Sequence, residues 1–427
     1  MRVALGVALC LAPTLSAQQG APRWFKGNLH THSLWSDGND FPEMIADWYA
    51  RHGYNFLALS DHNVLSNTVR WIDVELPKRR GGAQALERYR ARFGTDWVET
   101  REREAVNKEK KQVKRTEVRL KRLDEFRSLV ETPGEFLMIQ AEEITDSAHG
   151  RLPVHINATN VGERIKPQHG KGVQDVMRRN LRAVAAQAER LQRTIVAHLN
   201  HPNYGWGVTA EDLAHVVEEQ FFEVFNGHRG TRHLGDKLHA SVERMWDIAN
   251  TLRLSVLNAP PLFGIATDDS HHYHGKNLTS TPGRGWIMVQ ATELSAAAIT
   301  EAVTRGDFYA STGVTLRSVT FADKTLSIEI EPTGDTKFTT RFIGTRKGWN
   351  RDTAAVLDAK GNKLRATKRY SNDVGVTLAT VVGGTASYRV AGNEVWVRAV
   401  VTSTRAHSNP MFERQLQQAW TQPVGWR

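Results

Sequence analysis

Short apolar runs alternate along the first three quarters of the chain with longer segments whose apolar residues recur at the spacing of a helix face. The short runs have the length and composition of strands, and strands that alternate with helices predict parallel βαβ units. The runs span residues 25–32, 56–62, 136–145, 153–158, 194–201, 221–226 and 262–268. The helices between them are expected at 42–52, before 127, at 173–193 and at 239–252. Seven such strands indicate an α/β fold and, more specifically, a (β/α) barrel.

Polar residues that can bind a metal ion stand at the end of almost every one of these runs. In a (β/α) barrel the carboxyl ends of the strands open on one mouth, so residues far apart in sequence meet there. His30 and His32 are two positions apart in a strand, which places both imidazoles on the same face. Imidazole and carboxylate groups suit zinc, iron and manganese. The residues at the run ends are His30, His32, Asp61, His62, Glu142, Glu143, His155, His198, His201, Glu223, Asn226, Asp268, Asp269, His271 and His272.

The pattern changes after residue 313, where short β-like runs are separated by Gly, Asp and Asn turns. These runs cover residues 316–321, 326–330, 337–343, 388–390 and 395–401. Such spacing is typical of an antiparallel β-sandwich. We therefore expect a catalytic domain over residues 23–313 and a smaller β-rich domain over residues 314–427.

The first 17 residues have the layout of a secretory signal peptide, with a basic start, an apolar core and a cleavage site after Ala17. The apolar run is shorter than the roughly 20 residues that a bilayer requires, so no transmembrane anchor is expected. Cys10 is the only cysteine and lies in this leader. We therefore expect an exported protein, periplasmic or secreted, whose metal ions are held by nitrogen and oxygen rather than by thiolate.

The formal net charge of +10 raises the question of an anionic partner. Much of the Lys and Arg lies between Lys78 and Arg127, mixed with acidic residues in a pattern that predicts a charged helical insert at about residues 70–130. Mixed charge of this kind indicates a solvated helix face, and no interleaving of basic and aromatic residues indicates base stacking. We expect a small-molecule substrate, with neither a nucleic-acid partner nor an obligate protein partner.

Several motifs follow one another in the order found in the PHP family, named for polymerase and histidinol phosphatase domains. They are His30-Thr31-His32 with Ser36-Asp37-Gly38, Ser60-Asp61-His62-Asn63, Glu143-Ile144-Thr145, Asn200-His201-Pro202 and Asp268-Asp269-Ser270-His271. The resemblance runs from about residue 25 to about residue 313. The segments 223–227, 268–272, 305–313 and 418–423 look like the branch that includes carbaryl-hydrolase-like metallohydrolases. The resemblance implies a distorted seven-stranded barrel with two or three divalent ions of zinc, manganese or iron.

The same resemblance implies a set of ligands for each ion. Glu143 would bridge the first and second ions, and the adjacent Glu142 is the alternative, because neighbouring residues of a strand face opposite ways. His201 matches the motif better than His198, which is a core residue or a group behind the ligands. The first ion would be held by His30, His32 and Asp269, the second by His155 and His201, and the third by Asp37, His62 and His271.

Other residues at the predicted mouth have less defined roles. Asp61 would orient an imidazole, as carboxylates behind a metal commonly do. Glu223 and Asn226 are either catalytic groups or plain strand-end partners, and His272 either touches substrate or lies on a loop surface. Asp268 is an alternative ligand.

Metal ions bridged in this way lower the pKa of a shared water. We expect a metal-dependent hydrolase that uses a metal-bridged hydroxide, and the leading interpretation is a phosphoesterase or phosphatase on small anionic substrates. Hydrolysis of a carbamate, amide or ester is the alternative that the branch resemblance supports, and a non-catalytic exported metal-binding module is the second alternative. Gly-x-Ser-x-Gly and phosphate-binding Gly-Lys-Ser/Thr motifs are absent from the sequence.

Overall fold

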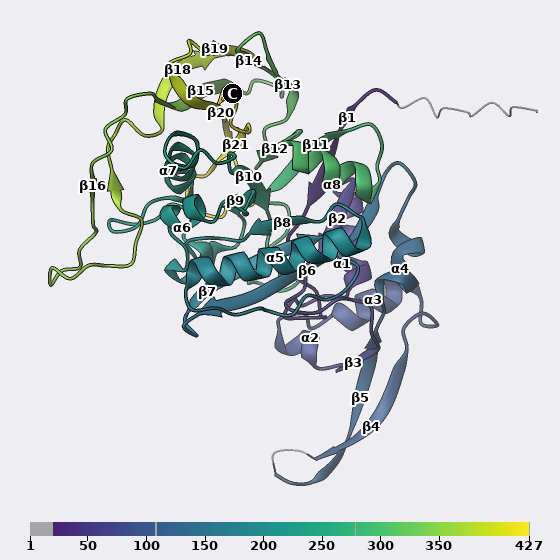
Figure 1. The fold of residues 1–427 in the computed structure, drawn as a ribbon. Coiled ribbons are helices and arrows are strands. Elements are labelled where there is room, and N and C mark those ends of the chain that lie inside the picture. The colour runs from purple at the N-terminus through teal and green to yellow at the C-terminus, as the bar shows by residue number, and fades with distance from the viewer. Residues whose placement is uncertain (1–19, 107–108, 278, 427) are drawn as a thin grey trace, which may run out of the picture.

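The computed structural model describes residues 20–106, 109–277 and 279–426. The expected leader, residues 1–17, lies outside these ranges. Within them, no helix has both the length and the apolar character needed to cross a bilayer. The chain is a mixed α/β protein with one long sheet and separate antiparallel sheets (Figure 1).

The seven runs predicted as strands all contain strands, and these are neighbours in a thirteen-stranded sheet in the order β10-β9-β8-β7-β6-β2-β1. The run predicted over residues 25–32 is too long, because β1 ends at Asn28 and His30 and His32 follow the strand. Parallel pairing joins β1 to β2, β2 to β6, β8 to β9 and β9 to β10. These strands are β1 (Arg23–Asn28), β2 (Phe56–Leu59), β6 (Leu137–Ala148), β7 (Leu152–Thr159), β8 (Val196–Leu199), β9 (Phe221–Asn226) and β10 (Phe263–Thr267).

The two outer strands of this series, β1 and β10, meet again just beyond their carboxyl ends. Thr31 and Ser270 form an isolated parallel bridge. The Asp269 N–H donates to the carbonyl oxygen of His30, and the His32 N–H donates to that of Ser270, both at 2.9 Å. The segments that carry the His-x-His and Asp-Asp-Ser-His motifs therefore lie side by side.

The expectation that all seven strands run parallel is wrong for β7, which is antiparallel to both β6 and β8. Only residues 149–151 join β6 to β7, and a parallel connection needs a crossover of a dozen or more residues. Because β7 runs in the opposite direction, its amino-terminal half lies beside the carboxyl ends of its neighbours. His155 therefore reaches the same end of the sheet as the other candidate ligands.

Helices cover the outside of these strands, and those predicted at 42–52, 173–193 and 239–252 are found with small shifts at their ends. These helices pack on the strands through their apolar faces. In the amphipathic helix α1, for example, Ile45 and Tyr49 are buried in one cluster with Leu57 of β2. The helices are α1 (Pro42–Arg51), α2 (Leu76–Arg79), α3 (Ala85–Phe93), α4 (Leu123–Val130), α5 (Val173–Leu191), α6 (Ala210–His215), α7 (Val242–Ser255) and α8 (Ala296–Arg305), with the 3-10 turns η1 (Tyr204–Trp206) and η2 (Arg229–Thr231).

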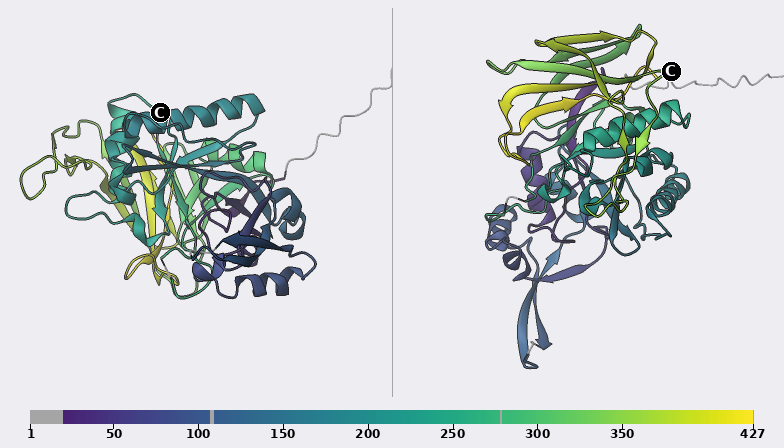
Figure 2. Two further views of the ribbon diagram at one scale, coloured as in Figure 1. Left: turned by 90° about the horizontal axis from the view of Figure 1, so that it is seen from below. Right: turned by 90° about the vertical axis from the view of Figure 1, so that its left-hand side faces the viewer.

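The charged insert is only in part the helical segment that we expected: it contains α2, α3 and α4, but its other half is β structure. Its centre is a sheet of β3 (Arg70–Asp73), β5 (Gln112–Leu120) and β4 (Thr100–Val106), from which the β4–β5 hairpin projects away from the body (Figures 1 and 2). Charges that alternate along a strand can pair across to its neighbour. Glu117 lies 2.6 Å from Arg101 and 3.2 Å from Arg103. The mixed charges that resembled a helix face are therefore cross-strand pairs.

The β-rich carboxyl-terminal region has two antiparallel layers. A three-stranded sheet faces a four-stranded extension of the long sheet, and both contribute to one apolar core that includes Leu326, Ile328, Phe342 and Val397. The extension is continuous with the rest of the long sheet because β21 pairs with β12. The strands are β11 (Trp286–Ala291), β12 (Phe308–Ser311), β13 (Leu316–Ala322), β14 (Thr325–Ile330), β15 (Phe338–Arg346), β16 (Thr353–Ala354), β17 (Arg369–Tyr370), β18 (Val376–Val382), β19 (Thr385–Arg389), β20 (Glu394–Ala406) and β21 (Leu416–Trp420).

Candidate metal centre

A cavity of about 420 Å³ opens where the carboxyl ends of the parallel strands meet the start of β7. Several candidate ligands line it, from strand ends and from the loops that follow them. The lining residues are Asp37, His62, Thr145, His155, His201, Tyr204, His228, Thr231, Asp269, His271 and His272.

Three donor atoms converge at the base of this cavity. The Nε2 atoms of His30 and His32 are 3.0 Å apart, and each lies 3.2 Å from Asp269 Oδ1. Two ligands bound about 2.1 Å from one ion at tetrahedral to octahedral angles are separated by about 3.0 to 3.4 Å. The three atoms therefore have the spacing of ligands to one ion. Glu143 Oε2 lies slightly farther away, 3.8 Å and 3.6 Å from the two imidazole nitrogens.

Glu143 also faces a second group of donors through its other oxygen. Glu143 Oε1 lies 2.9 Å from His155 Nδ1 and 3.7 Å from His201 Nε2. Glu143 Oε2 also lies 2.6 Å from His62 Nδ1. Among the described residues, these close contacts leave Glu143 Oε2 and His155 Nδ1 without a partner in hydrogen-bonding geometry. A cation at this place would give both buried atoms a partner. The donor set therefore fits a bridging carboxylate between two ions.

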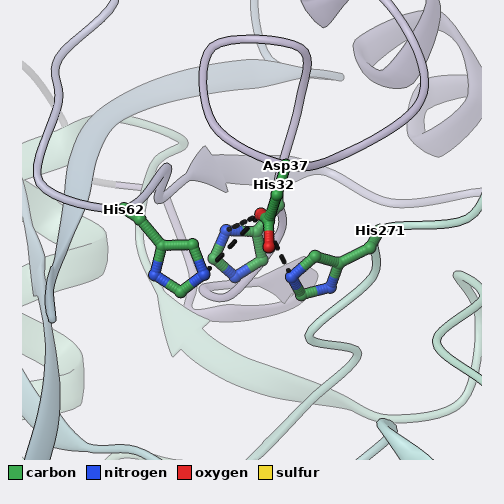
Figure 3. A group of neighbouring side chains, drawn as sticks. All are labelled: His32, Asp37, His62 and His271. Carbon is green, nitrogen blue, oxygen red and sulfur yellow. Dashed lines mark ion pairs between the residues drawn. The ribbon is translucent and has the colours of Figure 1, made fainter. Parts of the chain in front are cut away.

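A third group lies nearer to solvent and is shown in Figure 3. Asp37 Oδ1 lies 3.6 Å from His62 Nε2, 3.4 Å from His271 Nε2 and 3.8 Å from His32 Nδ1. The ring of His32 stacks against each of the other two imidazoles, at centroid distances of 4.4 and 4.0 Å. The Asp37 side chain is 51 % exposed, whereas the donors of the first group are buried. His32 therefore presents one ring nitrogen to the first group and the other to the third.

Local backbone conformation directs two of these ligands toward the cavity. Asp269 has φ 48° and His201 has φ 24°, in the left-handed region that residues other than glycine rarely adopt. The bond from the Asp269 N–H to the carbonyl of His30 holds the first of these turns against the end of β1. Such strained residues persist only where the surrounding structure fixes them, and they cluster at functional sites.

Glu223 and Asn226 lie behind the first group rather than in the cavity. Glu223 Oε1 is 2.6 Å from His30 Nδ1, and Glu223 also accepts bonds from the His201 N–H and the Asn226 amide. The Asn226 amide donates to Asp269 Oδ2 as well. Both side chains are buried. Their contacts are with the ligands, so the structure gives them a supporting position and no access to a substrate.

Glu142 and Glu143 face opposite ways along β6, as strand alternation requires. Glu142 accepts a 2.5 Å bond from the Ile165 N–H on the far side of the strand, and burial raises its pKa to about 7. His198 is likewise behind the ligands, 3.7 Å from Glu223, whereas His201 faces Glu143. His201 lines the cavity, and Glu143 lies directly behind the lining with its oxygens toward the histidines.

Asp61 and Asp268 have different surroundings from those expected. Asp61 accepts bonds from the backbone and hydroxyl of Ser33 and from the hydroxyl of Ser36, so its link to an imidazole runs through Ser36, 3.4 Å from His32. Asp268 is turned away from the ligands. It accepts bonds from the Tyr49 hydroxyl and from the backbone N–H groups of residues 283–285.

The electrostatics of the cluster favour ionised carboxylates. Burial acts to raise the pKa of Glu143 and of Asp269, but the neighbouring histidines hold both values well below the ordinary range. Burial and the charges of His271 and His62 lower the pKa of His32 to about 3. Against burial, which alone would lower it, Glu143 above all raises the pKa of His62 to about 11. A cation bound here competes with protons on such histidines, so metal affinity is expected to rise with pH.

Four residues of the cavity wall were not predicted. His228 follows β9 directly after Asn226-Gly227, so the rule that functional residues follow strand ends also applied to it. Thr145, Tyr204 and Thr231 belong to a strand and to loops whose paths the sequence pattern does not reveal. His272, which the sequence did single out, lines the cavity and accepts a 2.8 Å bond from the Asn277 amide at Nε2.

No family model and no curated protein sequence matches this chain. Among solved structures it is similar to a two-domain protein from Bacteroides vulgatus described as containing a predicted PHP-like metal-dependent phosphoesterase, with 14% identity over 99% of this chain and 100% of that chain and a TM-score of 0.38. It is also similar to a candidate metal-dependent phosphoesterase from Bifidobacterium adolescentis, with 12% identity over 61% of this chain and 93% of that chain and a TM-score of 0.31.

Proposed function

We propose that this protein is a metal-dependent phosphoester hydrolase of the PHP type that acts on small anionic substrates. One observation carries the proposal. Beside one cavity, Glu143 directs Oε2 at His30 and His32, at 3.8 and 3.6 Å, and Oε1 at His155 and His201, at 2.9 and 3.7 Å, while His62 Nδ1 lies 2.6 Å from Oε2. The seven strands with their Thr31–Ser270 bridge correspond, in this proposal, to a distorted PHP barrel.

The residues that would hold the ions follow from the three groups of donors. His30, His32 and Asp269 would hold the first ion, His155 and His201 the second, with Glu143 shared between them. Asp37, His62 and His271 would hold a third. Two divalent ions in such positions lower the pKa of a shared water and stabilise charge on the attacking and leaving oxygens of a phosphoryl group. Zinc, manganese and iron all accept these nitrogen and oxygen donors.

The protein's own groups arrange the ligands and admit the substrate. Glu223 fixes the ring orientation of His30 through its 2.6 Å bond to Nδ1. The first two groups of donors are deep in the protein, and the partly exposed Asp37 and His272 mark the open side. A volume of about 420 Å³ lies within the range of small-molecule sites, about 300 to 1,000 Å³. A substrate would therefore approach over the third group and place its reacting centre above Glu143.

The preference for an anionic substrate rests on charge. The chain has a formal net charge of +10, which attracts anions at long range. Close to the cavity, the half-buried Arg80 donates a 2.9 Å bond to the carbonyl of Gly38 and interacts electrostatically with Asp37. A guanidinium at this rim would favour a phosphate group over a neutral carbamate.

Export is part of the proposal and is supported by the signal-peptide pattern of residues 1–17. Amino-terminal sequencing of the protein recovered from the periplasm or the medium tests it, and a mature chain that begins at residue 18 is the expected result.

The division into a metal-binding domain and a β-rich domain near residue 314 is also proposed. The shared cluster of Phe225, Trp246, Trp396 and Trp420 indicates that the two parts pack as one body.

The enzymatic part of the proposal is tested with metal-reconstituted protein. Wild-type protein stripped of metal and reloaded with Mn²⁺, Zn²⁺ or Fe²⁺ is incubated with p-nitrophenyl phosphate and, separately, with an aryl carbamate. We expect metal-dependent release of phosphate and none from Glu143→Gln, which lacks the bridging charge. Turnover of the carbamate alone would replace the phosphoesterase proposal with a carbamate hydrolase, and no turnover with either substrate would contradict both.

A further inference from the structure

His228 lies on the wall of the metal cavity but does not belong to any group of donors that fits an ion. It lines the cavity, and its ring centroid is 5.8 Å from that of His271. Among the described residues, the groups of His, Asp and Glu with metal-ligand spacing leave it out. His228 is therefore close to the candidate ligands without being one of them.

The protein fixes the backbone of His228 from both sides. Its N–H donates to Asn226 Oδ1 at 2.8 Å, and its carbonyl oxygen accepts bonds from the Thr231 N–H at 3.1 Å and the Thr231 hydroxyl at 2.8 Å. Asn226 in turn donates to Asp269 Oδ2. The position of His228 is thus coupled to a ligand of the first group.

The hydrogen bond made by the side chain defines which ring nitrogen carries the proton. His228 Nδ1 accepts a 3.0 Å bond from the Gly230 N–H. A nitrogen that accepts a bond has no proton, so the neutral ring carries its proton on Nε2. With Nδ1 accepting this bond, Nε2 is the donor of the ring, and it makes no bond to a described residue.

We infer that His228 Nε2 donates a hydrogen bond to an anionic oxygen of the substrate, and to the same oxygen of the released phosphate. The inference rests on the proposed function. A donor held in place before the reaction, in a partly buried wall, stabilises negative charge that develops on the oxygen it faces. The proton stays on Nε2 throughout, so His228 contributes affinity and charge stabilisation and transfers no proton.

Two substitutions separate this role from a structural one. In His228→Asn the short amide can still accept the Gly230 N–H bond, but no donor reaches the position of Nε2. In His228→Gln the longer amide can place a donor near the position of Nε2, but the acceptor for Gly230 is lost. His239→Asn is the matched control, because His239 is on the same loop, stacks on Trp206 and is absent from the cavity lining.

The readout is the affinity of the manganese-loaded full-length protein for inorganic phosphate, measured by calorimetry, with metal content measured on the same samples. We expect His228→Asn to weaken phosphate binding by about 10- to 100-fold, the range for a bond to a charged group. His228→Gln and His239→Asn should stay within about threefold of wild type, and metal content should be unchanged in all three. Equal affinity of His228→Asn and wild type, or a larger loss in His228→Gln than in His228→Asn, would overturn the inference and leave the proposed function intact. Absence of phosphate binding and of phosphatase turnover in the wild type would overturn both.

Discussion

The imidazole of His30 and the carboxylate of Glu223 are joined by a 2.6 Å contact between Nδ1 and Oε1, in a part of the protein closed to solvent. Because Nδ1 is engaged by the carboxylate, Nε2 is left free to face His32 and Asp269. A carboxylate behind a metal-binding histidine fixes the ring and raises its basicity. Glu223 is therefore placed to strengthen the first ion position without touching the ion.

This relationship predicts the effect of Glu223→Gln. The amide keeps the shape of the side chain but loses its charge, so affinity for the first ion should fall by about 10- to 100-fold. Titration of metal-free protein with Zn²⁺ in the presence of a competing chelator measures the change. Glu219→Gln, which removes another buried carboxylate from the same segment at the far end of β9, should leave the affinity unchanged. Equal affinities in wild type and Glu223→Gln would contradict the assignment.

The opposite orientations of Glu142 and Glu143 give a second prediction. Glu143→Gln should lose most of the bound metal and lower turnover about a thousandfold or more, because a shared carboxylate holds both ions. Glu142→Gln should retain metal and activity, since Glu142 bonds the Ile165 N–H on the far side of β6 and burial already favours its neutral form. Metal analysis by mass spectrometry and p-nitrophenyl phosphate turnover measure both. Similar behaviour of the two variants would be incompatible with a bridging Glu143.

The exposure of Asp37 predicts the order in which ions leave. The third group is open to solvent through Asp37, whereas His30, His32 and Glu143 are buried. Stepwise addition of a weak chelator should therefore remove one equivalent of metal well before the other two. Asp37→Asn should lack that early equivalent from the start. A single cooperative loss of all metal, unchanged by Asp37→Asn, would argue against a separate third ion.

A buried carboxyl far from the cavity predicts a dependence of stability on pH. Burial raises the pKa of Glu219 to about 8, against the opposing charge of Arg253. Between pH 4.5, where Glu219 ionises in the unfolded chain, and pH 8, the folded protein retains a proton that the unfolded chain has released. The free energy of unfolding therefore falls as pH rises through this window, by about 1.4 kcal/mol per unit of pKa difference.

Glu219→Gln removes this titration. The difference in melting temperature between the variant and wild type, measured calorimetrically at pH 5, 6, 7 and 8 with saturating metal, should shift progressively in favour of the variant. Other titrating groups cancel in the difference. A difference that is constant across these pH values would show that Glu219 has an ordinary pKa.

The parts of the fold and site that the sequence predicted are those governed by local pattern. The strand runs and the helix α1 follow from periodicity, which acts over a few residues. Periodicity also requires Glu142 and Glu143 to face opposite ways, but the preference for Glu143 came from its Glu-Ile-Thr motif. The reversed direction of β7 was not predicted, although the gap between the predicted runs, residues 146–152, is shorter than the dozen or more residues that a parallel crossover needs. The spacing of the runs was therefore a signal of the antiparallel direction that the apolar pattern by itself does not carry.

Long-range partners account for the remaining differences. The β4–β5 hairpin was taken for a helix because the pairing of Arg101 with Glu117 joins two strands and is not visible in either one alone. Asp61 was expected against an imidazole, but the loop that follows β1 places Ser33 and Ser36 in between. The role inferred for His228 depends on a turn that brings the Gly230 N–H to Nδ1. Side-chain environment of this kind is set by tertiary structure.

The central claim is that Glu143 joins two metal positions in one cavity. The most direct measurement is anomalous diffraction from crystals grown with Mn²⁺, recorded at the manganese absorption edge. The account predicts one peak among His30, His32 and Asp269 and a second beside His155 and His201, each about 2.0 to 2.3 Å from a different oxygen of Glu143. A further peak among Asp37, His62 and His271 would correspond to the third ion. No peak within bonding distance of Glu143, or a peak beside only one of its oxygens, in crystals of metal-loaded protein would contradict the bridging role.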